Sequence, residues 1–133
     1  MAKVLTAWIG GNDLNGIKPD AKGPGPIAAT LAKLQATQGF DRLELLYNYP
    51  QSDVAPYLEW LGDKAGIPVN ARYATLKSPI HFGDIYQHTN TLLTELADAD
   101  LHILLSPGTP AMQAVWILLS KTRFPATYWQ SSP

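Results

Sequence analysis

Residues 104–126 read LLSPGTPAMQAVWILLSKTRFPA and contain an apolar strand, a sharp polar corner and a helix in direct succession. In the corner, Gly108 lets another group approach the backbone closely, Thr109 suits the N-cap of a helix, and Pro110 suits its first position. Beyond the corner, apolar residues recur at the i, i+3, i+4 and i+7 positions of one helical face: Met112, Val115, Trp116 and Leu119. The stretch predicts a strand that turns directly into a helix, as in α/β folds.

The rest of the chain repeats this strand-to-helix pattern. Continuous apolar runs, typical of strands buried on both faces, alternate with segments of helical period. The expected strands are 3–9, 42–47, 69–76, 101–105 and 126–130, and the expected helices are 26–39, 53–66, 82–97 and 110–121. We expect Asp53 to cap the second helix, and the strand 69–76 to lie near an edge. The pattern predicts an α/β fold with a Rossmann-like, doubly wound, mostly parallel sheet of about five or six strands and helices on both faces.

The size and composition of the chain fit a single domain. Its 133 residues are 46% hydrophobic and 16% charged, enough to bury one core. The formal net charge of -1 argues against direct binding of duplex DNA. The chain has no cysteine for a disulfide or a thiolate metal site, and its first apolar run breaks at Gly10, too early for a membrane span. We expect one cytoplasmic domain, residues 1–133, without a membrane partner.

The C-terminus is unusual for such a fold. Residues 128–133 read YWQSSP, and the chain stops where the last expected strand finishes, with no closing helix. We therefore expect residues 1–133 to be a fragment of a longer protein.

Three loops of unusual composition are expected at one edge of the sheet. They are residues 9–16 (IGGNDLNG), 76–84 (LKSPIHFGD) and 105–112 (LSPGTPAM), which follow the first, third and fourth strands. In doubly wound sheets, ligands bind outside the carboxyl ends of the strands, where the strand order reverses. Glycine, hydroxyl, amide and carboxylate groups therefore gather where the topology favours a ligand site. Each loop taken alone is equally consistent with a capped turn that binds nothing.

Several groups in these loops suit contacts to a polar ligand. The helix that starts after Thr109 presents free N–H groups, which favour an anion such as phosphate. The amide of Asn12 and the carboxylate of Asp13 are suited to a base or a ribose hydroxyl. Lys77 and Ser78 are suited to a phosphate, although a solvated surface lysine is the commoner outcome.

Common cofactor, metal and hydrolase motifs are absent from the sequence. It contains no G-x-G-x-x-G, G-x-x-x-x-G-K-[ST], H-E-x-x-H or G-x-S-x-G. The three histidines lack metal-ligand spacing. His102 is expected to be a packed or surface residue of a strand and His88 to be solvated on a helix, which leaves His81 as the one histidine placed for a ligand contact. We predict no metal and no cofactor.

The corner 105–112 and the loop 8–13 together resemble CARF domains, the CRISPR-associated Rossmann-fold sensors. The most specific shared feature is the turn SPGTPAM (106–112), and the second is the loop WIGGND (8–13). More narrowly, the segments GPGPIAATLA, HFGDIY and SPGTPAMQAVWILLSKTRFPA are similar to the N-terminal sensor region of RtcR-like bacterial enhancer-binding transcription regulators. The resemblance extends from the first strand to the end of the chain.

The resemblance implies a homodimer that binds one cyclic oligoadenylate across its two-fold axis. Carried over position by position, it implicates these ligand-contacting residues: Gly10, Gly11, Asn12, Asp13, Ser106, Gly108, Thr109 and Met112. Sheet geometry, rather than the family's motifs, adds Ser78, His81 and Phe82. In the regulator-type relatives, an AAA+ ATPase and a DNA-binding helix-turn-helix follow the sensor, and ligand binding would shift the dimer between two arrangements.

Three functions stay open at this point. The first is a non-enzymatic sensor. The second is a ring nuclease that cleaves its cyclic ligand without metal, by positioning a ribose 2′-OH against the adjacent phosphate, with Ser106, Thr109 and Lys77 as the residues to test. The third is an α/β interaction domain that binds no ligand. We favour the sensor over the nuclease because the sequence offers no strong general base.

Overall fold

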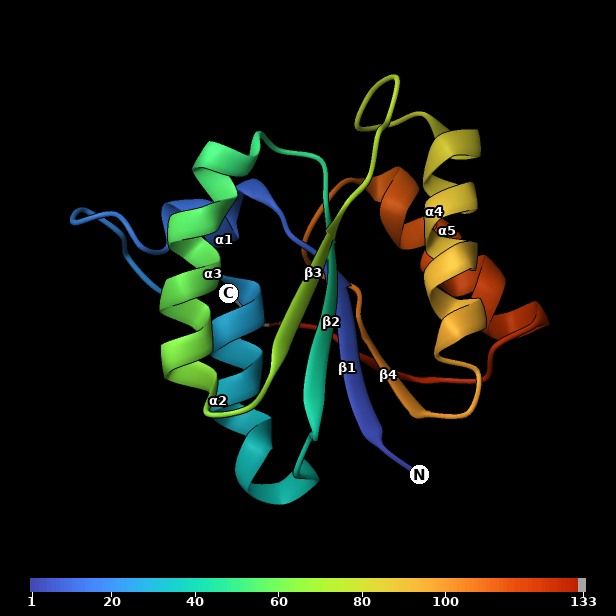
Figure 1. The fold of residues 1–133 in the computed structure, drawn as a ribbon, viewed down its shortest axis with the longest axis horizontal. Helices are drawn as coiled ribbons and strands as arrows, with labels where there is room; N and C mark the ends of the chain where they lie inside the picture. The colour runs from blue at the N-terminus through green and yellow to red at the C-terminus, as the bar shows by residue number, and fades with distance from the viewer. Residues whose placement is uncertain (132–133) are drawn as a thin grey trace.

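The computed structural model describes residues 1–131, which form one parallel sheet with helices on both faces (Figure 1). The strands are β1 (Lys3–Trp8), β2 (Arg42–Tyr47), β3 (Val69–Tyr73), β4 (Asp100–Leu104) and β5 (Thr127–Trp129), in the order β3-β2-β1-β4-β5. The helices are α1 (Gly11–Asn15), α2 (Pro26–Gln38), α3 (Gln51–Ala65), α4 (Phe82–Glu95) and α5 (Pro110–Thr122). Ser132 and Pro133, part of the expected chain end, lie outside the described residues. The predicted Rossmann-like α/β fold is confirmed, with five strands that all run parallel.

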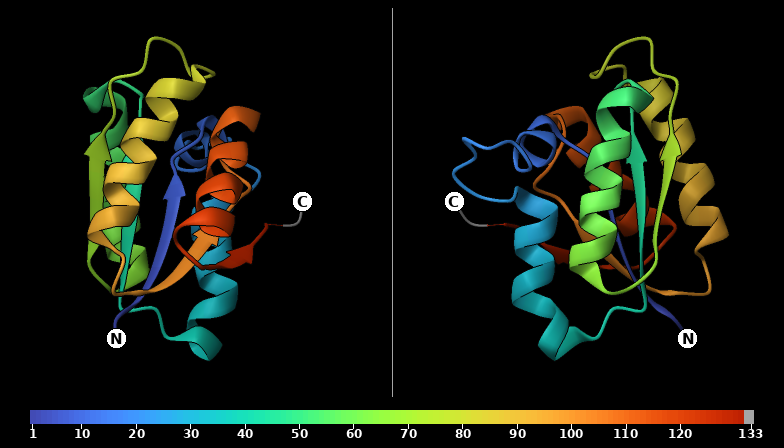
Figure 2. Two further views of the ribbon diagram at one scale, coloured as in Figure 1. Left: turned by 90° about the vertical axis from the view of Figure 1, so that its right-hand side faces the viewer. Right: turned by 60° about the vertical axis from the view of Figure 1, so that its left-hand side comes forward.

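The helices form two layers, one on each face of the sheet (Figures 1 and 2). Helices α1, α2 and α3 pack together on one face, and α4 and α5 pack against each other on the opposite face. In β1, Val4 and Trp8 belong to the core beneath α4 and α5, whereas Leu5 and Ala7 belong to the core beneath α2 and α3. Successive strand residues point to opposite faces, and both faces of β1 are covered, so its sequence is apolar almost throughout.

Helix α5 follows the pattern predicted for it. Its predicted apolar face is buried: Met112, Val115, Trp116 and Leu119. Thr109 occupies the N-cap position and Pro110 the first helical position, as expected. Ile117 and Leu118 lie on the opposite side and are exposed. A single apolar stripe therefore fixes how α5 lies against the sheet.

Three local features differ from the sequence prediction. Helix α3 begins at Gln51 with Pro50 at the N-cap position, so the prediction that Asp53 is the cap is wrong; Asp53 lies in the first turn, where the helix dipole also favours a carboxylate. Strand β3 ends at Tyr73 rather than at residue 76, although it lies at the edge of the sheet as expected. The short helix α1 was not predicted, because GNDLN has no apolar period.

The strand order reverses between β1 and β4. From β1 the chain builds outward through β2 to β3 and then crosses to β4 on the other side of β1. Because all strands are parallel, the loops after β1, β2, β3 and β4 meet at one edge of the sheet. This edge, at the β1–β4 reversal, is where ligands bind in open α/β sheets.

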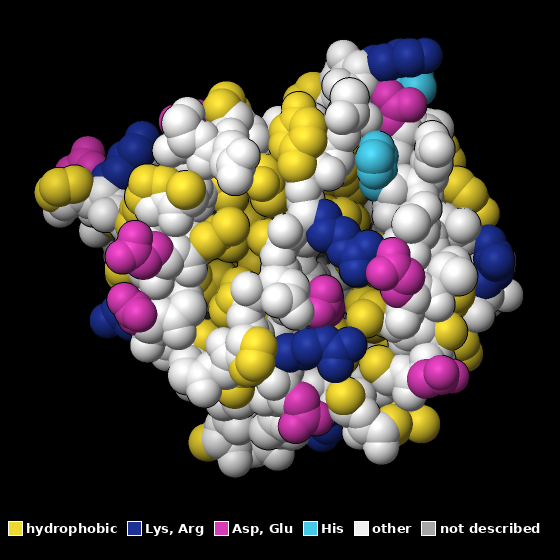
Figure 3. Space-filling model, viewed as in Figure 1, with side chains coloured by type: hydrophobic (Ala, Val, Ile, Leu, Met, Phe, Trp, Pro, Cys, Tyr) yellow, Lys and Arg dark blue, Asp and Glu magenta, His cyan; other side chains and the backbone are white. Residues whose placement is uncertain are grey.

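Charges of both signs are interspersed on the face shown in Figure 3, with no broad area of one sign. At the sheet edge, Arg72 of β3 donates two hydrogen bonds, of 2.5 and 2.9 Å, to the Glu95 carboxylate of α4. This face therefore lacks the extended basic track that suits duplex DNA. Within residues 1–131, no helix combines the length and apolar character needed to cross a membrane.

Candidate functional site

The corners after β1 and β4 touch through their backbones. A Cβ atom on Gly10 would lie 2.8 Å from the backbone nitrogen of Gly108, closer than real Cβ atoms come. Gly108 itself has a φ of 91°, and a Cβ there would lie 2.7 Å from the sulfur of Met112. Glycine is therefore required at both positions for the two corners to pack this closely.

Thr109 ties the corner after β4 to the loop after β3. Its hydroxyl accepts a hydrogen bond from the Met112 N–H at 3.3 Å, which caps α5, and donates one to the Pro79 carbonyl at 2.8 Å. The Thr109 N–H donates to the Met112 sulfur at 3.4 Å. The predicted N-cap role of Thr109 is confirmed, and the same hydroxyl positions a second loop.

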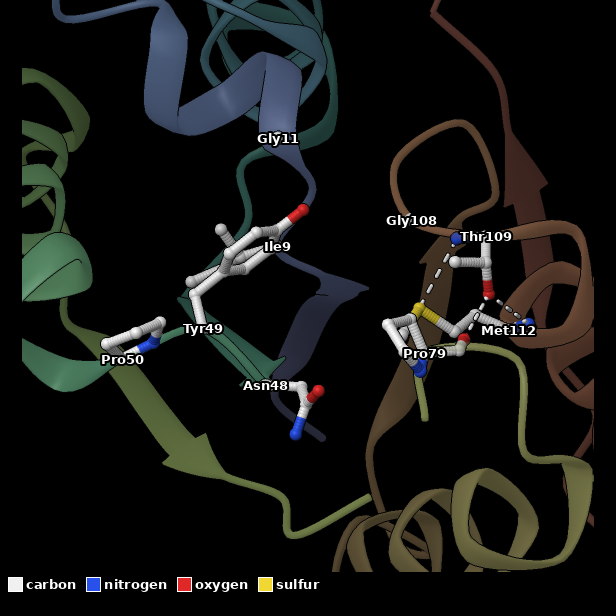
Figure 4. A pocket seen from close by; sticks show the side chains of 9 residues that line it. All are labelled: Ile9, Gly11, Asn48, Tyr49, Pro50, Pro79, Gly108, Thr109 and Met112. Carbon is white, nitrogen blue, oxygen red and sulfur yellow. Dashed lines mark hydrogen bonds between the residues drawn. The ribbon is translucent and has the colours of Figure 1, made fainter. Parts of the chain in front are cut away.

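A cavity of about 340 Å³ opens among these loops (Figure 4). Its lining residues are Ile9, Gly11, Asn48, Tyr49, Pro50, Pro79, Gly108, Thr109 and Met112. Figure 4 shows Tyr49 and Pro50 on one side and Pro79, Thr109 and Met112 on the other. The volume lies near the lower end of the range of about 300–1,000 Å³ that is typical of small-molecule sites.

The cavity lining is mostly apolar and contains no charged side chain. Helix α1 begins at Gly11 and helix α5 at Pro110, so two helix N-termini border the cavity. The first N–H groups of a helix lack partners within it, and they carry the positive end of its dipole. At α5, Pro110 has no N–H and the Met112 N–H is bonded to the Thr109 hydroxyl, so an anionic group in this cavity would be favoured by the helix dipole rather than by lysine or arginine.

Asp13 is a structural carboxylate. Its side chain is fully buried, and its two oxygens accept hydrogen bonds from the Gly10 N–H at 2.8 Å and the Ile27 N–H at 3.0 Å. Burial raises the pKa of Asp13 to about 6, against the opposing effect of these hydrogen bonds. The carboxylate joins the β1 corner to the start of α2. Asp13, predicted as a ligand contact, does not line the cavity and has no exposed surface.

The remaining residues predicted in the β1 and β4 corners divide between the cavity and its surroundings. Four of them line the cavity: Gly11, Gly108, Thr109 and Met112. Gly10 is buried behind it, in contact with Gly108. Asn12 is exposed and lines a separate hollow beside the loop 21–26, and the Ser106 hydroxyl accepts a hydrogen bond from the Ser131 N–H at 2.5 Å. Asn12 and Ser106 are therefore not brought to the cavity.

The loop 78–82 approaches the cavity only through Pro79. His81 is the N-cap of α4, where its Nδ1 accepts a hydrogen bond from the Asp84 N–H at 3.2 Å. Neither Ser78 nor Phe82 lines the cavity. Sheet geometry thus selected a loop that reaches the cavity, but the three side chains chosen within it lie outside the lining.

The residues named for cleavage do not assemble at the cavity. Of Ser106, Thr109 and Lys77, only Thr109 lines it. The Lys77 N–H donates to the Asp84 carboxylate at 2.8 Å, which lowers the pKa of that carboxyl. No histidine, carboxylate or lysine is part of the lining. Within the described part of the chain, no three His, Asp or Glu residues are grouped as metal ligands.

The other two histidines support the fold. His102 is buried in β4, and its Nδ1 accepts a hydrogen bond from the Trp129 indole N–H at 2.9 Å. His88 is half-buried, and its Nε2 lies 3.1 Å from the Thr75 carbonyl oxygen, so it is less solvated than expected. Of the packed and surface positions expected for His102, the structure shows the packed one.

Sequence reasoning missed the contribution of the loop after β2. Asn48, Tyr49 and Pro50 all line the cavity, and they follow β2 directly. The carboxyl end of β2 lies at the same edge as those of β1 and β4, and β2 is the neighbour of β1. An amide and an aromatic ring immediately after the buried run 43–47 were the signal that would have identified this loop.

Two solved structures share this architecture over nearly the whole chain. Csm6 from Enterococcus italicus, bound to cyclic hexa-2′-fluoro-hexa-dAMP, matches 99% of the chain with a TM-score of 0.74 and 17% identity. Can2 from Sulfobacillus thermosulfidooxidans, in complex with cyclic tetra-adenylate, matches 94% with a TM-score of 0.61 and 9% identity. The chain shares the fold of these two proteins over the matched residues.

The chain corresponds to only part of each similar protein. The match covers 34% of the Csm6 chain and 31% of the Can2 chain, so the chain spans about a third of their length. No protein-family model and no curated protein sequence matches it. At these identities the likeness concerns the fold, and the ligand has to be argued from the cavity.

Proposed function

We propose that this domain is a sensor that binds a cyclic oligoadenylate at the cavity between the β1 and β4 corners. The observation that carries the proposal is the position of the cavity at the β1–β4 reversal, where Gly11, Gly108 and Thr109 line it. Both similar structures contain cyclic adenylate ligands. A phosphate placed at the N-terminus of α5 would be favoured by the positive end of the helix dipole, without any basic side chain.

The size of the cavity supports a dimeric binding unit. A volume of about 340 Å³ accommodates a small ligand, whereas a ring of four or six nucleotides would extend well beyond it. Two copies of the cavity, related by a two-fold axis, would offer matching contacts to a symmetric ring. We propose a homodimer that binds one ring per two chains. The ring would shift the dimer between two arrangements and thereby regulate an attached effector, which by the resemblance to RtcR-like regulators is an AAA+ transcription activator.

The test is calorimetric titration of the protein with cyclic tri-, tetra- and hexa-adenylate and with a linear RNA that ends in a 2′,3′-cyclic phosphate. We expect one cyclic adenylate to bind at one ring per two chains. Thr109→Val should weaken binding about tenfold or more, because it removes a hydroxyl from the lining and loosens the start of α5. The matched control is Thr122→Val, since the Thr122 hydroxyl bonds the Leu118 carbonyl at the far end of α5.

The same titration separates the competing functions. Tight binding without cleavage products supports the sensor. Linear products in the reaction mixture would overturn it in favour of a ring nuclease. Absence of binding by a folded protein would overturn it in favour of an interaction domain.

A further inference from the structure

We infer that Asn48 selects adenine, by presenting its side-chain oxygen to the exocyclic amino group of a base in the cavity. This inference rests on the proposed function and adds the residue that distinguishes adenine from other bases. Asn48 follows β2, lines the cavity and is half-buried. Its amide is the only carboxamide in the lining.

The orientation of the Asn48 amide is fixed by its neighbour at the end of β3. Its Nδ2 donates a hydrogen bond of 2.7 Å to the Ala74 carbonyl oxygen. A carbonyl only accepts hydrogen bonds, so the amide nitrogen must face Ala74 and the amide oxygen must face away from it. The Ala74 backbone is itself held, because its N–H donates to the Tyr47 carbonyl at 2.8 Å. The direction of the Asn48 oxygen is therefore set before any ligand arrives.

The Asn48 oxygen is an available acceptor. Among residues 1–131 it has no hydrogen-bond partner, whereas the nitrogen of the same amide is occupied. Figure 4 shows the side chain between the two sides of the cavity, at the end away from Gly11, with its oxygen on the side of Pro79 and Met112. A group that enters the cavity and reaches this oxygen must supply a donor, because a buried acceptor left unpaired is costly.

The surrounding surfaces suit a flat ring. Tyr49 lies on one side, is 37% exposed, and its hydroxyl is 3.3 Å from the place that a Cβ on Gly11 would occupy. Pro79 and Met112 form the apolar surface on the other side (Figure 4). Aromatic side chains stack on bases of any kind, and apolar walls favour a ring over a charged group. A nucleotide would therefore place its phosphate at Gly11 and Gly108 and its base toward Asn48.

The chemistry of the bases then selects adenine. Adenine carries an amino donor at N6, whereas guanine carries an acceptor oxygen at the equivalent position. Hypoxanthine, the base of inosine, also has an oxygen there. An acceptor that faces the Asn48 oxygen gains no hydrogen bond and leaves both groups unpaired. Cytosine has an amino donor, but its single ring offers less surface to Tyr49 than a purine does.

The experiment compares cyclic tetra- and hexa-adenylate with their inosine counterparts by calorimetric titration. For the wild-type protein, we expect the inosine ring to bind about 10- to 100-fold more weakly than the adenine ring of the same size. Asn48→Ala should bring the two affinities to within about threefold, because no fixed acceptor is left to discriminate. Asn70→Ala is the matched control, since its amide bonds Glu44 on the sheet and does not line the cavity, and it should keep the wild-type ratio.

The outcomes separate this inference from the function on which it rests. If the wild-type protein binds adenine and inosine rings equally, the assignment of Asn48 is overturned while the sensor function stands; this comparison needs no variant to fold. A folded Asn48→Ala variant that keeps the wild-type ratio of adenine-ring to inosine-ring affinity overturns the assignment as well. If the wild-type protein binds no adenylate ring, the proposed function itself fails.

Discussion

A Cβ atom on Gly10 would lie 2.8 Å from the backbone nitrogen of Gly108, so the corners after β1 and β4 are in direct backbone contact. These two corners belong to strands that are neighbours in the sheet but are separated by about a hundred residues of chain. The contact closes the sheet edge at the strand reversal and leaves the cavity beside it. The shape of the site thus depends on residues without side chains.

The Gly10→Ala variant should lose stability. The added methyl group would force the two corners apart, at a cost of about 1–3 kcal/mol in the free energy of unfolding. Gly62→Ala is the control, because Gly62 lies within α3 and no atom is within 4 Å of its added Cβ. There, alanine should stabilise the helix by about 0.5–1 kcal/mol. Urea unfolding measures both values, and equal effects of the two substitutions would contradict the contact.

The Thr109 hydroxyl should be needed both for the start of α5 and for the position of Pro79. Thr109→Val keeps the shape of the side chain but loses both hydrogen bonds, so we expect a loss of about 1–2 kcal/mol. Thr109→Ser keeps the hydroxyl and should remain close to the wild type. Thermal unfolding followed by circular dichroism makes the comparison. A serine variant as unstable as the valine variant would show that the methyl group, not the hydroxyl, matters.

Asp13 should make stability depend on pH. Its pKa rises from 3.8 to about 6 on folding, so the folded state holds the proton more tightly than the unfolded state. The contribution of Asp13 to the free energy of unfolding is therefore greatest below pH 3.8. It falls by about 3 kcal/mol as the pH rises through 6.

Asp13→Asn isolates this contribution. The amide cannot accept from both Gly10 and Ile27, which adds a cost that does not vary with pH. The stability of the wild type relative to the variant should therefore fall between pH 4 and pH 7 in urea unfolding. A difference that stays constant over this range would show that Asp13 ionises as readily when folded as when unfolded.

The indole N–H of Trp129 should help to hold the edge strand β5. It donates to His102 on β4, so Trp129→Phe keeps an aromatic ring but loses the hydrogen bond, at about 0.5–1.5 kcal/mol. In the Trp129→Phe variant, amide hydrogen exchange should accelerate more in β5 than in β1, relative to the wild type. Trp60→Phe on α3 provides the control for loss of an indole N–H. Equal rates of β5 amide exchange in Trp129→Phe and Trp60→Phe would indicate that packing alone holds β5.

Much of the fold could be predicted because its local signals agree with each other. Thr109, Pro110 and the apolar stripe of α5 all indicate the same helix start, and the run 43–47 is apolar except for Glu44 because both faces of β2 are covered. The cap of α3 was predicted wrongly because aspartate is favoured both at an N-cap and in a first turn. Only the extended backbone of Pro50 distinguishes the two positions.

The candidate site was predicted only in part, because some of its features depend on packing and on strand order rather than on local sequence. Gly108 and Thr109 were identifiable from the chemistry of a strand-to-helix corner. The burial of Asp13 was not, because it depends on the short helix α1 turning inward against α2. Asn48 and Tyr49 were missed because the strand order, which places β2 beside β1, had to be known first.

The central claim is that a cyclic adenylate binds where the two corners meet, and mapping of backbone amide shifts by NMR tests it most directly. On addition of cyclic tetra- or hexa-adenylate, we predict that the largest shifts occur at Gly11, Gly108 and Thr109, which line the cavity. Largest shifts in the loop 21–26, or no shifts at ligand excess, would contradict the claim.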